Sequence, residues 1–128
     1  MVKREKLDLD RLALSEAQAV KAFVRAVNTS FPGLVSRIVL FGSKARGDSR
    51  AESDIDILVV VRGEDWRLSN AISTLAARIS LEQDVLLGPV VIGKERWERM
   101  EREKFSLYRN ITRDGLVLGE GGGISILA

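Results

Sequence analysis

The chain has 128 residues and a formal net charge of +2, with 45% hydrophobic and 30% charged residues. These values are typical of one globular domain and exclude a disordered chain. No run approaches the roughly 20 apolar residues that cross a bilayer, and no apolar segment follows the basic N-terminal residues as it would in a secretory signal. We therefore expect a cytoplasmic protein that does not contact a membrane.

The residue types that are missing restrict the chemistry further. The chain has no cysteine and no histidine, which excludes a thiolate nucleophile, a zinc ribbon and an Fe–S cluster and removes the commonest general base. Catalysis would have to use carboxylates, hydroxyl groups, lysine, arginine and a hard metal ion such as magnesium. The 20 basic and 18 acidic residues are interspersed along the chain, so the sequence predicts no specific nucleic-acid interface.

The N-terminal part predicts one helix followed by one strand. Ser15, with Gln18 three residues later, has the spacing of a capping box. Four apolar residues follow at the spacing of one helix face: Val20, Phe23, Val24 and Val27. The helix is expected to end at residues 31–33, where Phe-Pro-Gly interrupts the pattern. Residues 34–41 then predict a strand, because they end in an apolar run that Gly42 breaks.

The middle of the chain predicts two further strands separated by a helix. Residues 54–61 read as a strand whose last five positions are all apolar, as expected for a central strand covered on both faces. Apolar residues between Ile72 and Ile79 predict the helix. Asp84 opens a third strand over residues 85–92, in which Gly88-Pro89 indicates a bulge or an edge position, because proline cannot donate to a ladder.

The remaining segments complete an α/β (α+β) domain with a small mixed β-sheet of three to four strands flanked by helices. Residues 94–104 and 105–114 predict two helices, and residues 116–118 predict a short strand. Trp66 and Trp97 are expected to pack against the sheet. Residues 1–118 are assigned to this domain and residues 119–128 to a glycine-rich flexible tail.

Two aspartates at the start of the second strand are the first indication of function. Asp54 and Asp56 are separated by one residue, so their carboxylates lie on one face of a strand, with Cα atoms roughly 7 Å apart. Ile55 between them points the opposite way, into the core. Carboxylates placed side by side repel each other, whereas magnesium prefers such oxygen ligands. The pair therefore predicts a metal site.

A glycine–serine turn after the first strand adds a second component. Gly42 lets the backbone approach a phosphate closely, and Ser43 can donate a hydrogen bond together with the amides of a short helix. Lys44 and Arg46 follow, and Arg46 is available for a charge-assisted contact. Each residue alone would be an ordinary turn or surface residue. Together with the aspartates they predict a nucleoside triphosphate site that shares a pocket with a metal site.

These residues resemble a known signature. Gly42-Ser43, ten further residues and Asp54-Ile55-Asp56 match the GSx10DxD pattern of the DNA polymerase β-like nucleotidyltransferase superfamily, and the flanking residues resemble its minimal nucleotidyltransferase (MNT) branch. The resemblance implies a nucleotidyltransferase fold and the transfer of a nucleoside monophosphate from a triphosphate, with ATP as the expected donor, to a hydroxyl acceptor. It also implies that Gly42 and Ser43 hold the triphosphate and that Asp54 and Asp56 bind two magnesium ions (Mg2+).

The same resemblance implies a third carboxylate on the next strand. Asp84 occupies the matching position. In this role it would complete one metal site and help to deprotonate the acceptor. Read without the resemblance, Asp84 is a carboxylate at the end of a loop.

The resemblance also implies a biological role. MNT proteins are typically paired with a helical HEPN-type toxin, which they counteract as antitoxins, and some adenylylate that partner on a tyrosine. Two alternatives stay open: a transferase that acts on a small hydroxylated molecule, and a binding module that neutralises its partner without catalysis. The sequence leaves open the acceptor, the base preference and the oligomeric state, a homo-oligomer included.

Overall fold

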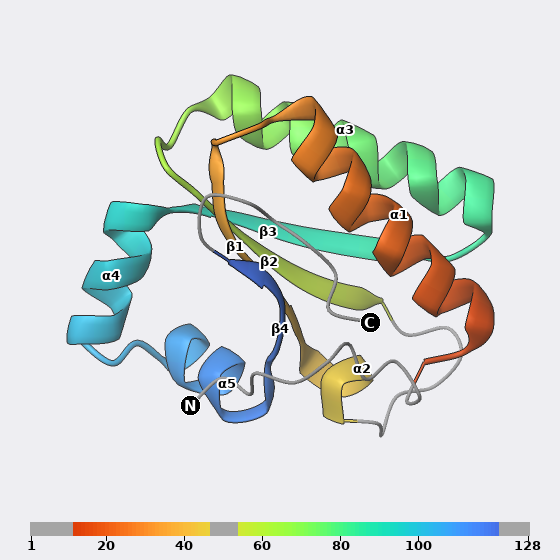
Figure 1. Cartoon of the computed structure of the whole chain (residues 1–128). Helices are drawn as coiled ribbons and strands as arrows, with labels where there is room; N and C mark the ends of the chain where they lie inside the picture. Colours follow the sequence, from red (N-terminus) through yellow and green to blue (C-terminus); the bar gives the residue numbers. More distant parts are fainter. Residues whose placement is uncertain (1–11, 47–53, 121–128) are drawn as a thin grey trace.

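A four-stranded mixed sheet forms the centre of the computed structural model, which describes residues 12–46 and 54–120 (Figure 1). The strands are β1 (Val35–Phe41), β2 (Ile55–Val61), β3 (Leu87–Gly93) and β4 (Leu116–Glu120), in the order β3-β2-β1-β4. β1 is antiparallel to both β2 and β4, whereas β2 and β3 run parallel. The mixed α/β arrangement predicted from the sequence is confirmed.

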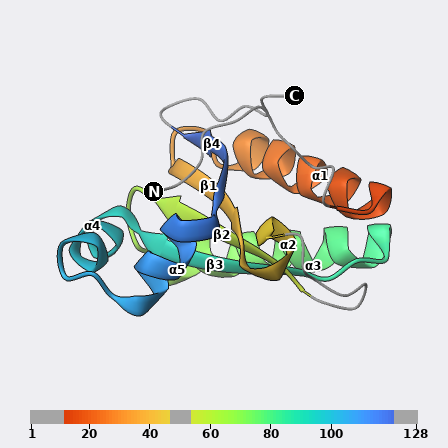
Figure 2. The same cartoon turned by 90° about the horizontal axis from the view of Figure 1, so that it is seen from below.

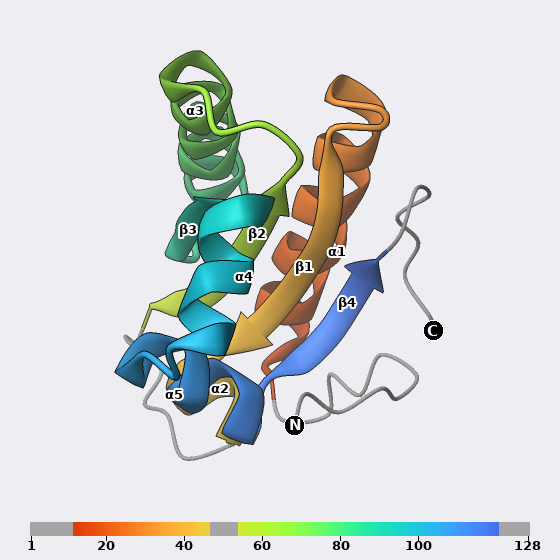
Figure 3. The same ribbon diagram turned by 90° about the vertical axis from the view of Figure 1, so that its left-hand side faces the viewer.

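Helices cover both faces of this sheet. Within the described residues they are α1 (Leu14–Ser30), α2 (Gly42–Arg46), α3 (Trp66–Gln83), α4 (Lys94–Arg102) and α5 (Ser106–Asp114). α1 and α3 lie on one face and α4 and α5 on the other, while the short α2 lies at the end of β1 (Figures 2 and 3). Among the described helices, none is long and apolar enough to cross a membrane.

The burial of β2 explains its uniformly apolar sequence. Ile57 and Val59 belong to the core formed with α1 and α3, whereas Leu58 and Val60 belong to the core formed with α4 and α5. Successive residues of a strand point to opposite faces, so a strand covered on both sides needs an apolar residue at every position. The sequence-based prediction of a central strand is therefore confirmed.

The start of α1 differs from the prediction. The helix begins at Leu14 after the N-cap Ala13, so Ser15 lies inside the first turn and is not the cap. The Glu16 carboxylate reaches back and accepts a hydrogen bond from the Ala13 backbone N–H at 2.9 Å. The prediction failed because an acidic residue at the third helical position satisfies the backbone donor without help from Ser15.

The two edge strands of the sheet agree with the prediction at β3 and differ from it at β4. Pro89 lies in β3, which pairs with β2 alone and is therefore an edge strand, as predicted. β4 continues through Glu120, two residues into the expected tail, and residues 121–128 lie outside the described part.

Trp97 is buried as predicted, but Trp66 is 70% exposed. Trp66 is the first residue of α3, and its ring faces solvent. The Arg67 guanidinium lies over this ring, with its carbon 5.1 Å from the ring centroid.

The N-cap of α3 gives a direct test of stability. The Asp65 carboxylate accepts a hydrogen bond from the Arg67 backbone N–H at 2.8 Å. Asp65→Ala is expected to lower the free energy of unfolding by about 1 kcal/mol, because that amide loses its acceptor. Urea denaturation measures the change. Asp65→Asn, which keeps the acceptor oxygen, should retain most of the stability, and equal losses in both variants would contradict the capping role.

Candidate active site

The predicted site residues gather where β1 ends and β2 begins. Phe41, the last residue of β1, pairs with Asp56 near the start of β2. Gly42 follows directly and opens α2. The antiparallel register therefore brings the glycine turn beside the aspartates, although ten residues separate the two motifs in the sequence.

Gly42 lies directly against the Asp56 carboxylate. Its φ of +77° is in the left-handed region, which residues with a Cβ rarely adopt. A Cβ at this position would overlap Asp56 Oδ2 and lie 3.2 Å from Asp56 Cγ. The turn thus requires glycine for two independent reasons, its backbone angle and the close approach of a carboxylate.

A second glycine leaves space on the other side of the aspartates. Gly88 of β3 pairs with Asp56. A Cβ on Gly88 would lie 3.8 Å from Asp56 Oδ1 and 3.9 Å from Asp54 Cβ. Asp54 and Asp56 therefore share one face of the sheet, while Ile55 between them is fully buried. Gly88 was missed as a site residue because the sequence indicated only a break in the strand at Gly88-Pro89.

Asp84 lies apart from the strand that it was predicted to open. It is the C-cap of α3 in the left-handed conformation, with φ 54°, and its backbone N–H donates to the Ser80 carbonyl. α3 continues to Gln83 and Asp84 caps its C-terminus. β3 therefore begins only at Leu87. Across residues 12–46 and 54–120, no three carboxylates gather closely enough to hold one metal ion. The structure brings Asp54 and Asp56 together, and the metal role of Asp84 stays a prediction.

Lys44 makes its contact within the protein. Its side chain is 2% exposed, and its ammonium lies 2.5 Å from Glu16 Oε2 of α1. Burial of the Lys44 side chain leaves little of its surface for contact with a triphosphate. Ser43 and Arg46 belong to α2 as expected, but their side chains lie outside the described part of the structure. The nucleotide-binding roles of these three residues stay predictions.

Comparison with known proteins assigns the family. Residues 20–117, which include the turn, both aspartates and all four strands in part or whole, match the family model described as a nucleotidyltransferase domain. The chain belongs to the nucleotidyltransferase family. It is 35% identical over 105 residues to "Putative protein adenylyltransferase MJ0604" of Methanocaldococcus jannaschii, covering 82% of this chain and 99% of that protein. It is also 35% identical over 78 residues to "Putative protein adenylyltransferase MJ0141" of the same organism, covering 60% of this chain and 79% of the relative.

Solved structures share the fold of this nucleotidyltransferase. A "putative nucleotidyltransferase from Sulfolobus solfataricus" superposes with a TM-score of 0.57 at 22% identity and covers 99% of both chains. A mutant of the "toxin-antitoxin MntA-HpeT" gives a TM-score of 0.56 at 22% identity, covering 85% of this chain and 75% of the other. At these identities the likeness concerns the fold.

Tyr108 of the nucleotidyltransferase is part of the packing between α4 and α5. Its ring centroid lies 5.2 Å from that of Trp97, and its hydroxyl donates to Glu101 Oε2 at 3.3 Å. Burial raises the pKa of Tyr108 above its ordinary value, and the nearby Glu101 carboxylate raises it further. The tyrosine is therefore a neutral packing residue at physiological pH.

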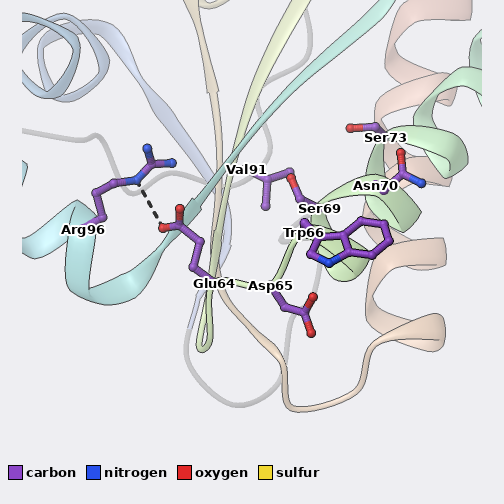
Figure 4. A pocket seen from close by; sticks show the side chains of 8 residues that line it. All are labelled: Glu64, Asp65, Trp66, Ser69, Asn70, Ser73, Val91 and Arg96. Carbon is purple, nitrogen blue, oxygen red and sulfur yellow. Dashed lines mark ion pairs between the residues drawn. The ribbon is translucent and has the colours of Figure 1, made fainter.

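Two hollows lie at the opposite end of the sheet from the aspartates. The larger, of about 670 Å³, contains the exposed Trp66 and the Glu64–Arg96 ion pair of 3.2 Å (Figure 4). Its lining consists of Glu64, Asp65, Trp66, Ser69, Asn70, Ser73, Val91 and Arg96. The same ion pair borders a hollow of about 530 Å³ next to α4. The seven residues of β2 separate these hollows from Asp54 by about 20 Å, and none of the predicted site residues lines either of them.

Proposed function

We propose that this nucleotidyltransferase transfers AMP from ATP to a hydroxyl group of a partner protein, and that it acts as the antitoxin of a HEPN-type toxin. Two kinds of observation support the proposal. The two curated relatives carry the name of protein adenylyltransferases. The MntA-HpeT structure, which has the same fold, is a toxin–antitoxin complex.

The contact between Gly42 and the Asp56 carboxylate is the observation that carries the chemistry. It joins a turn with backbone amides at the start of a helix to a pair of same-face carboxylates, the two components that a metal-bound triphosphate needs. Asp54 and Asp56 would hold two magnesium ions, which would polarise the phosphate oxygens and lower the pKa of the acceptor hydroxyl. These residues fit magnesium by the type of their ligand atoms, because magnesium binds carboxylate and phosphate oxygens.

The reaction then needs no histidine. The acceptor hydroxyl oxygen attacks the α-phosphorus, its proton passes to a carboxylate or to solvent, and the bond from the α-phosphorus to pyrophosphate breaks. The main task of the protein is to place the triphosphate in line with the hydroxyl, for which a rigid turn and fixed carboxylates suffice.

Labelled nucleotide transfer tests this proposal. The protein is purified together with its native partner and incubated with magnesium and ATP labelled in the α-phosphate. We expect label on a hydroxyl of the partner and a mass increase of one AMP. Tight binding of the partner without label would instead favour neutralisation by occlusion, and label on a small molecule would favour the stand-alone transferase.

Asp84 has its own test. Asp84→Asn should preserve the left-handed C-cap, because asparagine tolerates that conformation. As a third ligand and proton acceptor, Asp84 is expected to contribute on the order of 10²-fold to transfer. The matched control is Glu82→Gln, which removes an exposed carboxylate two residues away that pairs with Arg78 at 3.6 Å. Equal transfer by Asp84→Asn and Glu82→Gln would remove Asp84 from the site.

A further inference from the structure

Two charged side chains are buried in the part of the chain that the structure describes, and they pair with each other. Glu16 is 9% exposed and Lys44 2%. Lys44 Nζ lies 2.5 Å from Glu16 Oε2, and Glu16 Oε1 accepts the hydrogen bond from the Ala13 backbone N–H. Both carboxylate oxygens thus have donors, which fixes the Glu16 side chain at the first turn of α1.

Stability alone is a poor explanation for this pair. Each buried charge loses its hydration, and a pair of apolar residues with similar volume is often equally stable or more stable. What an ion pair adds is direction, because a charge-assisted hydrogen bond holds its partners within a narrow range of distance and angle. The pair therefore suits a position that needs a fixed orientation.

The element that receives this orientation is α2. With five residues, it is far too short to be stable by itself. Fully buried Ala45 anchors it to the core, and Lys44 anchors it to the N-terminal turn of α1, which lies at the same end of the molecule (Figures 1 and 3). Gly42, which lies against Asp56, is only two residues before Lys44.

We infer that Glu16 and Lys44 are positioning residues for the phosphate-binding turn. The ion pair holds α2 in one orientation, so that the backbone amides that begin at Gly42 keep their place relative to the Asp56 carboxylate. Lys44 acts through the helix and does not need to touch a phosphate. The link to nucleotide binding rests on the proposed function, whereas the effect on α2 does not.

The double variant Glu16→Leu/Lys44→Met tests this role, because it removes both charges without leaving one of them unpaired. We expect a modestly lower unfolding midpoint, because the Ala13 backbone N–H loses its Glu16 acceptor, and amide hydrogen exchange across residues 42–46 that is about tenfold faster. The dissociation constant of magnesium–ATP should rise about tenfold. This change corresponds to the loss of one charge-assisted hydrogen bond between a backbone amide of the turn and a phosphate oxygen. A small misplacement of the triphosphate should lower kcat/KM by about 10².

The matched control is Arg78→Met/Glu82→Leu, which removes the exposed ion pair of α3. It should change neither the exchange of residues 42–46 nor the affinity for magnesium–ATP. Unchanged exchange and affinity in Glu16→Leu/Lys44→Met would overturn the inference and leave the proposed function standing. A wild type that binds no magnesium–ATP would contradict the proposed function, and the exchange of α2 would still decide the positioning role.

A second variant covers the case in which the double variant does not fold. Glu16→Gln keeps the shape of the side chain and an acceptor oxygen for Lys44, but removes the negative charge. We expect several-fold faster exchange of residues 42–46 and several-fold weaker magnesium–ATP binding, because the buried Lys44 ammonium keeps an acceptor but loses its counter-charge. Wild-type values for both measurements would overturn the inference.

Discussion

Replacing Asp54 and Asp56 together by asparagine is expected to reduce nucleotide transfer by on the order of 10³-fold while leaving the fold intact. Bound divalent ions supply several kcal/mol of transition-state stabilisation, and each 1.36 kcal/mol is about tenfold in rate. Asparagine has nearly the shape of aspartate but lacks the charge that holds magnesium. Labelled transfer to the co-purified partner measures the loss.

The stability of this double variant supplies a separate measurement. Asp54 and Asp56 share a face beside Gly88, so their mutual repulsion should make the metal-free wild type no more stable than the variant. Magnesium–ATP at a hundred times its dissociation constant should stabilise the wild type by about 2.7 kcal/mol. The variant should gain much less. Equal stabilisation of both proteins would rule out the two aspartates as metal ligands.

Gly42→Ala is expected to have the second largest effect, a loss of about 10²-fold in transfer. The new Cβ would overlap Asp56 Oδ2 and displace the carboxylate, and misplacement of a catalytic group by about 1 Å can cost this much. The left-handed backbone adds roughly 1–2 kcal/mol of destabilisation. Transfer and urea denaturation should therefore both change.

Gly33→Ala is the matched control for this substitution. Gly33 has the same φ of +77°, but a Cβ there would meet nothing within 4 Å. We expect a similar loss of unfolding free energy and no loss of transfer, because Gly33 lies in the turn between α1 and β1. If Gly33→Ala impaired transfer as strongly as Gly42→Ala, the effect would be one of backbone strain and not of contact with Asp56.

The features that could be predicted from the sequence are those set by local pattern. The apolar run after Asp56 required a strand covered on both faces, and β2 is such a strand. The spacing of Asp54 and Asp56 required that they share a face, because side chains alternate along a strand. Gly42 at the end of an apolar strand indicated a tight turn, and its positive φ agrees with that expectation.

The features that could not be predicted depend on contacts between distant segments. Nothing in the neighbourhood of Lys44 indicates that Glu16, on another helix, will bury it. Gly88 beside Asp56 follows from the register between β2 and β3, which no local pattern specifies. The start of β3 was placed too early because the C-cap of α3 is Asp84 in the left-handed conformation, a position where glycine is the usual signal.

The pairing of β1 with β4 has a consequence for biosynthesis. β1 carries the Gly42 turn at its end, yet one of its two neighbours is β4, which contributes Leu116–Glu120. A growing polypeptide emerges from the ribosome with its N-terminal part first, so the edge of β1 stays unpaired until residue 120 has left the exit tunnel. Premature termination upstream of Leu116 would leave a permanently open strand edge, which recruits other chains into aggregates. Such truncated products should accumulate in the insoluble fraction of the cell.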